Sequence, residues 1–174
     1  MSSIQIIPFH FSDQYILQNL VSALEDDFQI PVKINSTEFN FSYAYDSSRK
    51  QYHSTQLLNG LLNFFNGHDG KIMGITELDL FIPILTFVFG EAQLNGKAAV
   101  VSSFRLEPQF YGLPKDEDLL MERIIKESVH ELGHTFGLKH CQAYDCVMSS
   151  STSADQIEIK SRYFCEDCKR EIQL

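Results

Sequence analysis

Three histidines fall within the segment from residue 130 to residue 140, at spacings that suit the binding of one metal ion. His130 and His134 are four residues apart in HELGH, so on a helix they stand one turn apart and can reach the same ion. Gly137 would let the chain leave the helix with a positive φ. His140 then follows three residues later and can supply a third nitrogen. Three imidazoles leave one position for water, which is the open arrangement of catalytic zinc.

Glu131 adjoins the first of these histidines and lies about 100° around the helix from it. This position puts a carboxylate beside the metal without making it the obvious third ligand. Zinc lowers the pKa of bound water to about 7, and a nearby glutamate can take its proton. The residues therefore match hydrolysis of an amide, with Glu131 as the general base. Two histidines opposite an apolar stripe can also be ordinary solvated residues, but Gly137 and His140 at the expected offsets favour the metal.

Four cysteines follow in the pattern C-x4-C, a spacer and C-x2-C; they are Cys141, Cys146, Cys165 and Cys168. Paired thiolates at such spacings suit a structural zinc site with four sulfur ligands. Two disulfides or a redox pair are the alternatives. We expect neither, because no secretion signal is evident and RYFCEDCKRE offers no clear helix start. Cys141 directly follows His140, so the two sites would share a piece of backbone.

The elements that must position these residues are expected to alternate between strands and helices. The pattern predicts strands at 3–9, 30–35 and 71–78, and helices at 13–28 and at 54–67 with Ser54 as its N-cap. Residues 36–52 show no clear period and are expected to form a loop. This alternation is typical of parallel βαβ units. Residues 86–104 are expected to form a hairpin with a two-residue type I′ turn at Asn95–Gly96, and one arm to be an antiparallel edge strand.

The histidine motif lies near the end of a helix expected from about residue 114 to 136. Pro114 suits its first turn, and the acidic residues 116–118 complement the helix dipole. Its apolar stripe spans about 140° on a helical wheel, with His130 and His134 on the opposite side. The stripe consists of Met121, Ile124, Ile125, Ser128, Val129, Leu132 and Phe136.

The composition of the 174 residues, 44% hydrophobic and 21% charged, is ordinary for a soluble protein. The formal charge of −9 argues against nucleic acid and anionic membranes as partners. We expect a cytoplasmic protein, since MSSIQIIPFHFSDQY has no basic n-region and residues 80–90 are too short to span a bilayer. A monomer is also expected. The isolated His10, His53 and His68 are interpreted as ordinary polar residues.

Taken together, the motifs resemble those of the archaemetzincin (archaelysin) family of zinc metalloproteases, which belongs to the metzincin clan. Met148, eight residues after His140, is where a methionine below the metal is expected, and a core methionine is compatible with that role. The resemblance covers about residues 70–168. The matching residues are His130, Glu131, His134, Gly137, His140, Cys141, Cys146, Met148, Cys165 and Cys168.

The resemblance implies an α/β fold: a metzincin-like twisted mixed sheet with an antiparallel edge strand, a backing helix, the active-site helix and a small C-terminal subdomain that binds zinc. We expect one catalytic domain over residues 1–174, divided at about 1–137 and 138–174. The resemblance also implies two zinc ions per chain, a catalytic one on the histidines and a structural one on the cysteines, with Glu131 as the base.

Two functions remain open from the sequence. The first is a zinc peptidase that hydrolyses a peptide or protein substrate with a zinc-bound water activated by Glu131. An extended peptide would then pair with the edge strand TFVFGEAQ, through an outward N–H at Val88 or Phe89. The second is a zinc-containing module that binds peptides with little or no turnover. An intact Glu131 favours the enzyme. No obvious tyrosine or histidine follows Met148 to stabilise an oxyanion.

Overall fold

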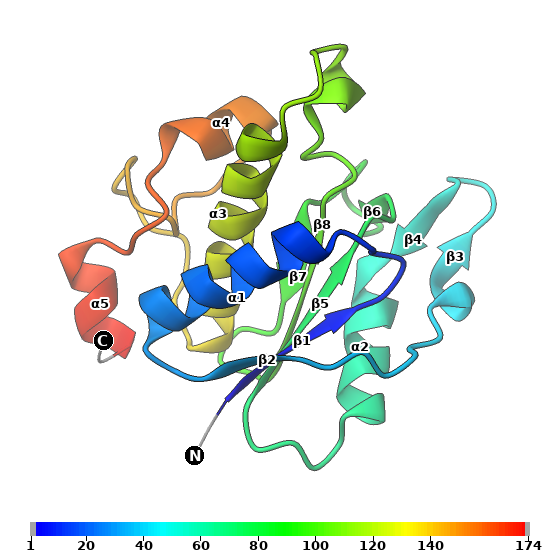
Figure 1. Ribbon diagram of the computed structural model, residues 1–174, viewed down its shortest axis with the longest axis horizontal. Helices are drawn as coiled ribbons and strands as arrows, with labels where there is room; N and C mark the ends of the chain where they lie inside the picture. Colours follow the sequence, from blue (N-terminus) through cyan, green and yellow to red (C-terminus); the bar gives the residue numbers. More distant parts are fainter. Residues whose placement is uncertain (1–2, 173–174) are drawn as a thin grey trace.

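Short apolar segments pair into a twisted five-stranded sheet, shown in the computed structural model, which describes residues 3–172 (Figure 1). The sheet order is β2-β1-β5-β8-β7. The first four strands run parallel and β7 runs antiparallel to β8, so the predicted mixed sheet with an antiparallel edge is confirmed. The strands are β1 (Ile4–Pro8), β2 (Val32–Ile34), β5 (Lys71–Thr76), β7 (Gly90–Ala92) and β8 (Ala98–Ser102).

Helices cover both faces of this sheet. Successive side chains of a strand point to opposite faces, so each central strand contributes to two apolar clusters. One cluster packs against α1 (Gln14–Phe28) and α3 (Glu117–Thr135), and the other against α2 (Ser54–Phe64). The first cluster includes Ile6, Met73 and Val101, and the second includes Ile7, Ile72 and Val100. Burial on both faces explains why β5 and β8 are almost continuously apolar.

The prediction of a loop at residues 36–52 was wrong. This segment forms a 3-10 turn, η1 (Ser42–Ala44), and two short strands, β3 (Tyr45–Asp46) and β4 (Gln51–His53). β4 pairs with β6 (Leu80–Phe81), which lies far away in the sequence. Strands of two or three residues that depend on such a distant partner leave no local period in the sequence. Ser54 is also not the N-cap: His53 holds that position, and the Ser54 hydroxyl bonds to the carboxylate of Glu91 and lies 3.2 Å from the carbonyl of Phe81.

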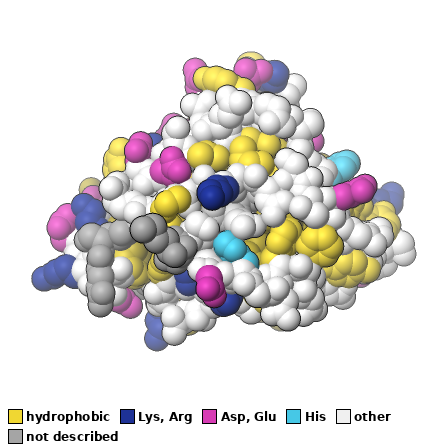
Figure 2. Space-filling model, turned by 60° about the horizontal axis from the view of Figure 1, so that its bottom comes forward, with side chains coloured by type: hydrophobic (Ala, Val, Ile, Leu, Met, Phe, Trp, Pro, Cys, Tyr) yellow, Lys and Arg dark blue, Asp and Glu magenta, His cyan; other side chains and the backbone are white. Residues whose placement is uncertain are grey.

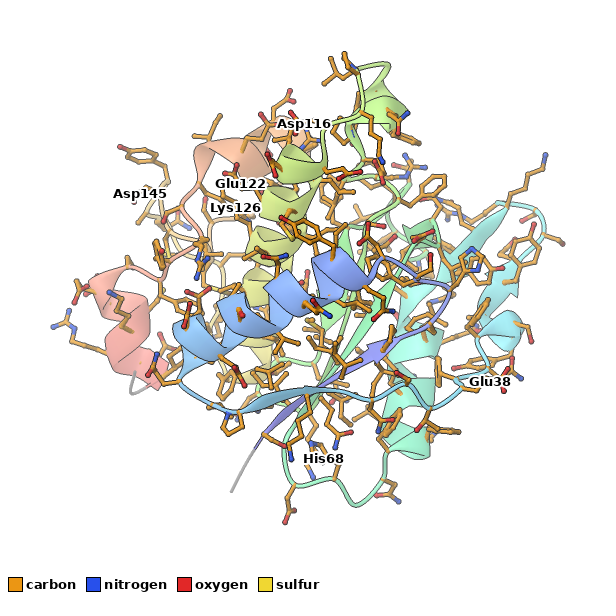
Figure 3. The ribbon with its side chains drawn as sticks, viewed as in Figure 1. Glu38, His68, Asp116, Glu122, Lys126 and Asp145 are labelled. Carbon is orange, nitrogen blue, oxygen red and sulfur yellow. The ribbon has the colours of Figure 1, made fainter. Side chains whose placement is uncertain are left out.

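The helix that carries the histidine motif is α3, and it is shorter than predicted. It begins at Glu117, after Pro114, because the Asp116 side chain caps it by accepting a hydrogen bond from the N–H of Leu119 at 2.9 Å. Figure 3 labels Asp116 at this start, and Glu122 and Lys126 further along. The Nζ atom of Lys126 donates to the carbonyl of Glu158 at 2.9 Å, so this side of α3 faces α4 (Ala154–Ile159).

The hairpin between β7 and β8 is confirmed, but its predicted two-residue turn is not. The N–H of Gly96 donates to the carbonyl of Gln93, which places Asn95 at the third position of the turn with φ 52°. Gln93 also donates its N–H to the carbonyl of Ala98, so the strands close outside the Asn95–Gly96 pair. The tip is therefore longer than a type I′ turn allows.

The edge of the sheet also differs from the expectation. The N–H of Val88 is taken by the carbonyl of Leu80 at 3.0 Å, and the carbonyl of Phe89 accepts from Ser102 on β8 at 2.8 Å. In an antiparallel ladder alternate residues face the partner strand, so Gly90 directs its backbone groups away from β8. Neither Val88 nor Phe89 is thus the outward donor. That role moves to Gly90.

Two helices in the C-terminal segment were not predicted, α4 and α5 (Glu166–Ile172). The first turn of α5 begins directly after Cys165, in the segment RYFCEDCKRE that showed no clear helix start. The segment shares one apolar cluster with the sheet and α1, since Phe28 contacts both Phe136 and Phe164 at ring-centroid distances of 5.2 and 5.6 Å. This cluster holds the loop after α3 in place.

The surface carries charges of both signs. Figure 2 shows acidic and basic side chains interspersed on one face, so neither sign gathers there into a single patch. Among residues 3–172, no helix has the length and apolar composition needed to cross a bilayer.

Candidate functional site

The last turn of α3 and the loop after it bring the three motif histidines together. One ring nitrogen from each of His130, His134 and His140 lies within 4.8 Å of the others. Gly137 takes φ 103° after the helix end, a conformation that favours glycine, and this turn carries the chain back towards the helix. His130 is buried, His134 is partly buried and His140 is exposed, so the cluster opens to solvent on one side.

Backbone carbonyls fix which nitrogen of each buried ring carries hydrogen. Nδ1 of His130 lies 2.8 Å from the carbonyl of Val147, and Nδ1 of His134 lies 2.7 Å from that of Leu138. A carbonyl only accepts, so both rings must donate from Nδ1. Burial lowers the pKa of His130 well below its usual value, and burial lowers that of His134 as well, which keeps both rings neutral. Both Nε2 atoms therefore present lone pairs.

These two lone pairs face each other at a distance that a shared cation would explain. The Nε2 atoms of His130 and His134 are 3.2 Å apart, and neither has a hydrogen to donate to the other. Two ligands of a tetrahedral zinc ion with bonds of about 2.05 Å lie about 3.3 Å apart. The histidine cluster therefore fits a zinc ion without rearrangement of these two rings.

Glu131 lies beside the histidines in a nearly closed environment, with 7% of its surface exposed. Burial raises the pKa of its carboxyl well above the usual range, and the nearby Glu127 raises it further. A Cβ atom at Gly90 would lie 2.7 Å from Cγ of Glu131, so the edge strand can approach this carboxylate only where there is no side chain. Gly90 was not singled out from the sequence, since only the packing shows this need.

Contacts from the sheet hold the end of α3. The N–H of Asn95, at the hairpin tip, donates to the carbonyl of His134 at 2.8 Å. Nζ of Lys71, on β5, donates to the carbonyls of Thr135 and Gly96, each at 2.7 Å. At the helix end these donors serve the carbonyls of His134 and Thr135, and that of His134 also accepts from the N–H of Gly137 at 3.0 Å. They tie the second histidine of the motif to β5 and to the hairpin.

Met148 lies beneath the active-site helix, fully buried. A Cβ atom at Gly133 would come within 2.5 Å of its Sδ and 3.2 Å of Cε1 of Phe164. The glycine in HELGH thus lets the helix rest directly on Met148. The neighbouring Val147 supplies the carbonyl that orients His130. The methionine is therefore a packed floor next to a group that positions a candidate ligand.

The four cysteines also converge. All four are free thiols, and their sulfurs lie within 4.8 Å of one another. Sγ of Cys141 is 3.8 Å from that of Cys165, and Sγ of Cys146 is 3.8 Å from that of Cys168. These distances exclude S–S bonds of about 2.05 Å. They equal the separation of about 3.8 Å expected between sulfurs that share a tetrahedral zinc with bonds of about 2.3 Å.

Backbone contacts join the two clusters. The N–H of Cys141 donates to the carbonyl of Met148 at 2.9 Å, and the N–H of Cys165 donates to Sγ of Cys146 at 3.4 Å. Burial raises the pKa of the Cys146 and Cys168 thiols, whereas hydrogen bonds, first of all from the backbone of Cys168, lower that of Cys165. The loop that follows His140 is thus shared by both clusters.

A cavity of about 400 Å³ opens beside the histidines. The segment from Leu85 to Gly90 forms one wall, and Ser150, Ser151 and Thr152 form another. His130, Glu131 and His140 line it towards the histidine cluster, and Glu127 also lines it. Glu127 pairs with Lys160, and sequence reasoning missed both residues because their meeting depends on the packing of α4 against α3.

The remaining histidines lie outside this cluster. His53 precedes α2 and contacts the ring of Phe81, with centroids 5.1 Å apart. Nδ1 of His68 is 3.3 Å from Nε2 of Gln5. Neither belongs to a group of potential metal ligands among the described residues, and neither does His10.

Known proteins are similar to this chain in sequence and in fold. The family described as peptidase family M54 matches residues 11–174. Archaemetzincin of Methanocaldococcus jannaschii is 44% identical over 131 residues, which cover 75% of this chain and 71% of that protein. Archaemetzincin of Thermococcus kodakarensis is 36% identical over 179 residues, covering 99% and 96% of the two chains.

Solved structures agree with these matches. The crystal structure of archaemetzincin from Methanopyrus kandleri superposes with a TM-score of 0.86 at 35% identity, covering 99% of this chain and 93% of that one. That of archaemetzincin from Archaeoglobus fulgidus, complexed with malonate, gives 0.83 at 34% identity, covering 97% and 99%. A structure described as a zinc-dependent peptidase from Methanocorpusculum labreanum gives 0.89 at 29% identity, covering 98% and 100%.

Proposed function

This chain belongs to peptidase family M54 and is a zinc metallopeptidase, and we propose that it hydrolyses peptide bonds at the cluster formed by His130, His134 and His140. The observation that carries the proposal is the facing pair of Nε2 atoms 3.2 Å apart, with both Nδ1 hydrogens committed to carbonyls. Such a pair is stable when it shares a cation. Three neutral imidazoles also leave a position free for water or substrate.

Zinc held by this set would lower the pKa of a coordinated water to about 7 and polarise a substrate carbonyl. The chain itself supplies the proton transfer. Glu131 is buried beside the ligands, and its raised pKa suits a group that takes a proton from the attacking water and passes it to the leaving amine. His134 and His130 keep their Nδ1 hydrogens on backbone carbonyls throughout, so their orientation does not change.

We propose a structural role for a second zinc ion at the four cysteines. The paired S–S distances of 3.8 Å and the shared volume of the four sulfurs support a closed tetrahedral site. Such an ion would join α5 to the loop after the active-site helix, which carries Cys141 and Cys146. This arrangement supports one metzincin-type domain over residues 1–174, divided at about 137 into two subdomains.

The substrate class we propose is a peptide or protein. Gly90 at the sheet edge directs backbone groups outward next to Glu131, which supports binding of an extended peptide by strand addition. The charge of −9 gives no support for nucleic acid as a substrate. Free cysteines arranged for metal are typical of a reducing compartment, which supports a cytoplasmic location. A monomeric state remains a prediction that sedimentation would check.

Replacement of Glu131 by glutamine tests the enzyme against a peptide-binding module. Glu131→Gln keeps the shape of the side chain but removes the proton acceptor. We expect zinc content and peptide binding to be retained while turnover falls about 10²–10⁴-fold, as for loss of a general base. Metal analysis and a peptide-library digest read by mass spectrometry measure both quantities. Equal cleavage by both proteins would remove Glu131 from the mechanism, and no cleavage by the wild type would favour the binding module.

A further inference from the structure

Besides the histidines and Glu131, the cavity beside the histidine cluster is lined by polar residues to which the proposed reaction assigns no role. The segment from Leu85 to Gly90 contributes mostly apolar side chains to its lining, and residues 150–152 contribute hydroxyl groups. Glu127 lies one helical turn before Glu131 on α3, on the same side of the helix. A substrate whose scissile carbonyl lies beside Glu131 would place a neighbouring side chain within reach of Glu127.

Glu127 is held by a buried ion pair. Its exposed fraction is 4%, and that of Lys160 is 2%. Nζ of Lys160 lies 3.1 Å from Oε1 of Glu127 and donates to the carbonyl of Ser149, also at 3.1 Å. The pair fixes the carboxylate with one oxygen committed. Within residues 3–172 we find no hydrogen bond to the second oxygen, Oε2, although the residue lines the cavity.

A second polar atom without a partner belongs to another residue that lines the cavity. Oγ of Ser151 is buried and has no hydrogen-bond partner in the part of the chain that the structure describes. Ser151 lines the cavity together with Glu127. A buried hydroxyl without a hydrogen-bond partner destabilises the folded protein. The Ser151 hydroxyl therefore indicates that a ligand group or a water molecule bonds to it.

We propose that this cavity is the subsite for one of the two residues that flank the scissile bond, and that Glu127 and Ser151 make it select a long side chain ending in N–H donors, such as glutamine or lysine. The inference rests on the proposed peptidase function. A volume of about 400 Å³ has room for such a side chain. The apolar wall packs against its methylene groups, and the two oxygens accept its terminal hydrogens.

Three peptide side chains distinguish recognition of N–H donors from recognition of side-chain size alone. Glutamine, methionine and glutamate have similar length. Only glutamine ends in donors that match two acceptors, methionine offers none, and glutamate would place a carboxylate next to Glu127. A site built to bind donors disfavours analogues that lack them because its buried acceptors are left unpaired. Glutamine should therefore be preferred over methionine, and methionine over glutamate.

The test uses zinc-loaded protein and a host peptide found in the library digest. The residues before and after its cut are each replaced by glutamine, methionine and glutamate. Dissociation constants are measured by fluorescence anisotropy on the Glu131→Gln protein, and kcat/KM on the wild type. At one of the two positions we expect glutamine to exceed methionine by about tenfold in both measurements, the size of one hydrogen bond to a charged group.

The decisive variant replaces the ion pair as a whole, Glu127→Leu together with Lys160→Met. Removing one partner alone would leave a buried charge unpaired and could unfold the protein, whereas two apolar residues of similar size are tolerated. We expect the preference to reverse in favour of methionine. Ser151→Ala should reduce the preference by a smaller factor. Both variants are compared at the same zinc content.

A matched control uses a neighbouring ion pair, which joins α3 to α4 just before Lys160, the residue that directly follows α4. Arg123 and Glu158 also join α3 to α4 but do not line the cavity. Arg123→Met together with Glu158→Leu should keep the glutamine preference while changing stability. If the control and the Glu127 variant lose activity on all peptides equally, with unchanged ratios, the pair is structural only and the inference is wrong.

The outcomes separate the subsite from the reaction. Cleavage by the wild type without a preference among the three side chains overturns the subsite and leaves the peptidase function standing. If no peptide is cleaved, a host peptide selected by binding is used. A glutamine preference in binding then supports the subsite although the reaction has failed, and equal binding of the three peptides overturns it.

Discussion

The contact between the active-site helix and Met148 predicts that alanine at position 133 has opposite effects in two backgrounds. In an ordinary helix interior, Gly→Ala stabilises a protein by about 1 kcal/mol. At Gly133 the new Cβ would lie 2.5 Å from Sδ of Met148. Met148 is fully buried against Phe164, so the thioether has little room to move. Overpacking of this kind costs about 1–3 kcal/mol.

The two terms combine into a net loss of about 0–2 kcal/mol for Gly133→Ala in the wild type, from overpacking less the gain in helix propensity. Met148→Ala alone should cost about 2–5 kcal/mol, because it leaves a cavity. In that background the clash with Sδ is absent and the 3.2 Å contact with Cε1 of Phe164 remains, so Gly133→Ala should stabilise by at most about 1 kcal/mol. The coupling between the two positions is then about 1–3 kcal/mol, the overpacking term alone.

Urea unfolding of the zinc-loaded wild type, both single variants and the double variant measures this coupling, provided that the m-values agree. Activity gives a second measurement. A shift of Met148 displaces the adjacent carbonyl of Val147, which orients His130, so Gly133→Ala should lower the affinity for catalytic zinc in the wild-type background. Equal stabilisation by Gly133→Ala in both backgrounds would show that the contact carries no energy, and would refute the account of Met148 as a packed floor.

Three further predictions concern metal and substrate. Wild-type protein should contain about two zinc ions, and His134→Ala should contain about one and keep its fold. Cys165→Ser should be less stable and should bind catalytic zinc more weakly. If elemental analysis finds one ion in the wild type, the assignment of two sites is wrong. Methylation of the backbone nitrogens of a bound peptide should weaken binding at alternate positions only, if the peptide pairs with the edge at Gly90; a flat response in a competition assay would exclude strand addition. Lys71→Met should lower zinc affinity and raise the rate of hydrogen exchange in the last turn of α3, because the carbonyl of Thr135 loses a donor; unchanged exchange would show that Lys71 is not needed there.

The order of strands and helices could be predicted because their signals are local. The strands β1, β2 and β5 are apolar and are separated by α1 and α2, which have an apolar face. The helix α3 carries its histidines at a spacing that any helix brings to one side. Asp116 shows how a boundary was misplaced. Pro114 is acceptable in a first turn, but the Asp116 side chain is the better cap and the helix begins after it.

The missed features depend on distant partners. The short strand β4 needs β6, and the hydroxyl of Ser54 is diverted to Glu91. Glu127 and Lys160 are 33 residues apart, and nothing in either local sequence indicates that they meet. The same holds for Gly90. Only the packing of Glu131 against it shows that position 90 has no room for a side chain. The sequence thus predicted the ligand types, whereas packing determines the walls of the cavity around them.

The loop from Leu138 to Met148 gives a physical reason for the two clusters to lie so close. The carbonyls of Leu138 and Val147, near its two ends, accept from His134 and His130. The N–H of Cys141 donates to the carbonyl of Met148 at 2.9 Å, which ties the beginning of the loop to its end. A flexible loop could not hold two imidazoles in fixed orientations, because each carbonyl would move independently. Four sulfur ligands, two of them in this loop and two near α5, would remove that freedom at both ends at once. We therefore expect a zinc ion at the cysteines to affect catalysis only indirectly, by fixing the carbonyls that orient the histidines.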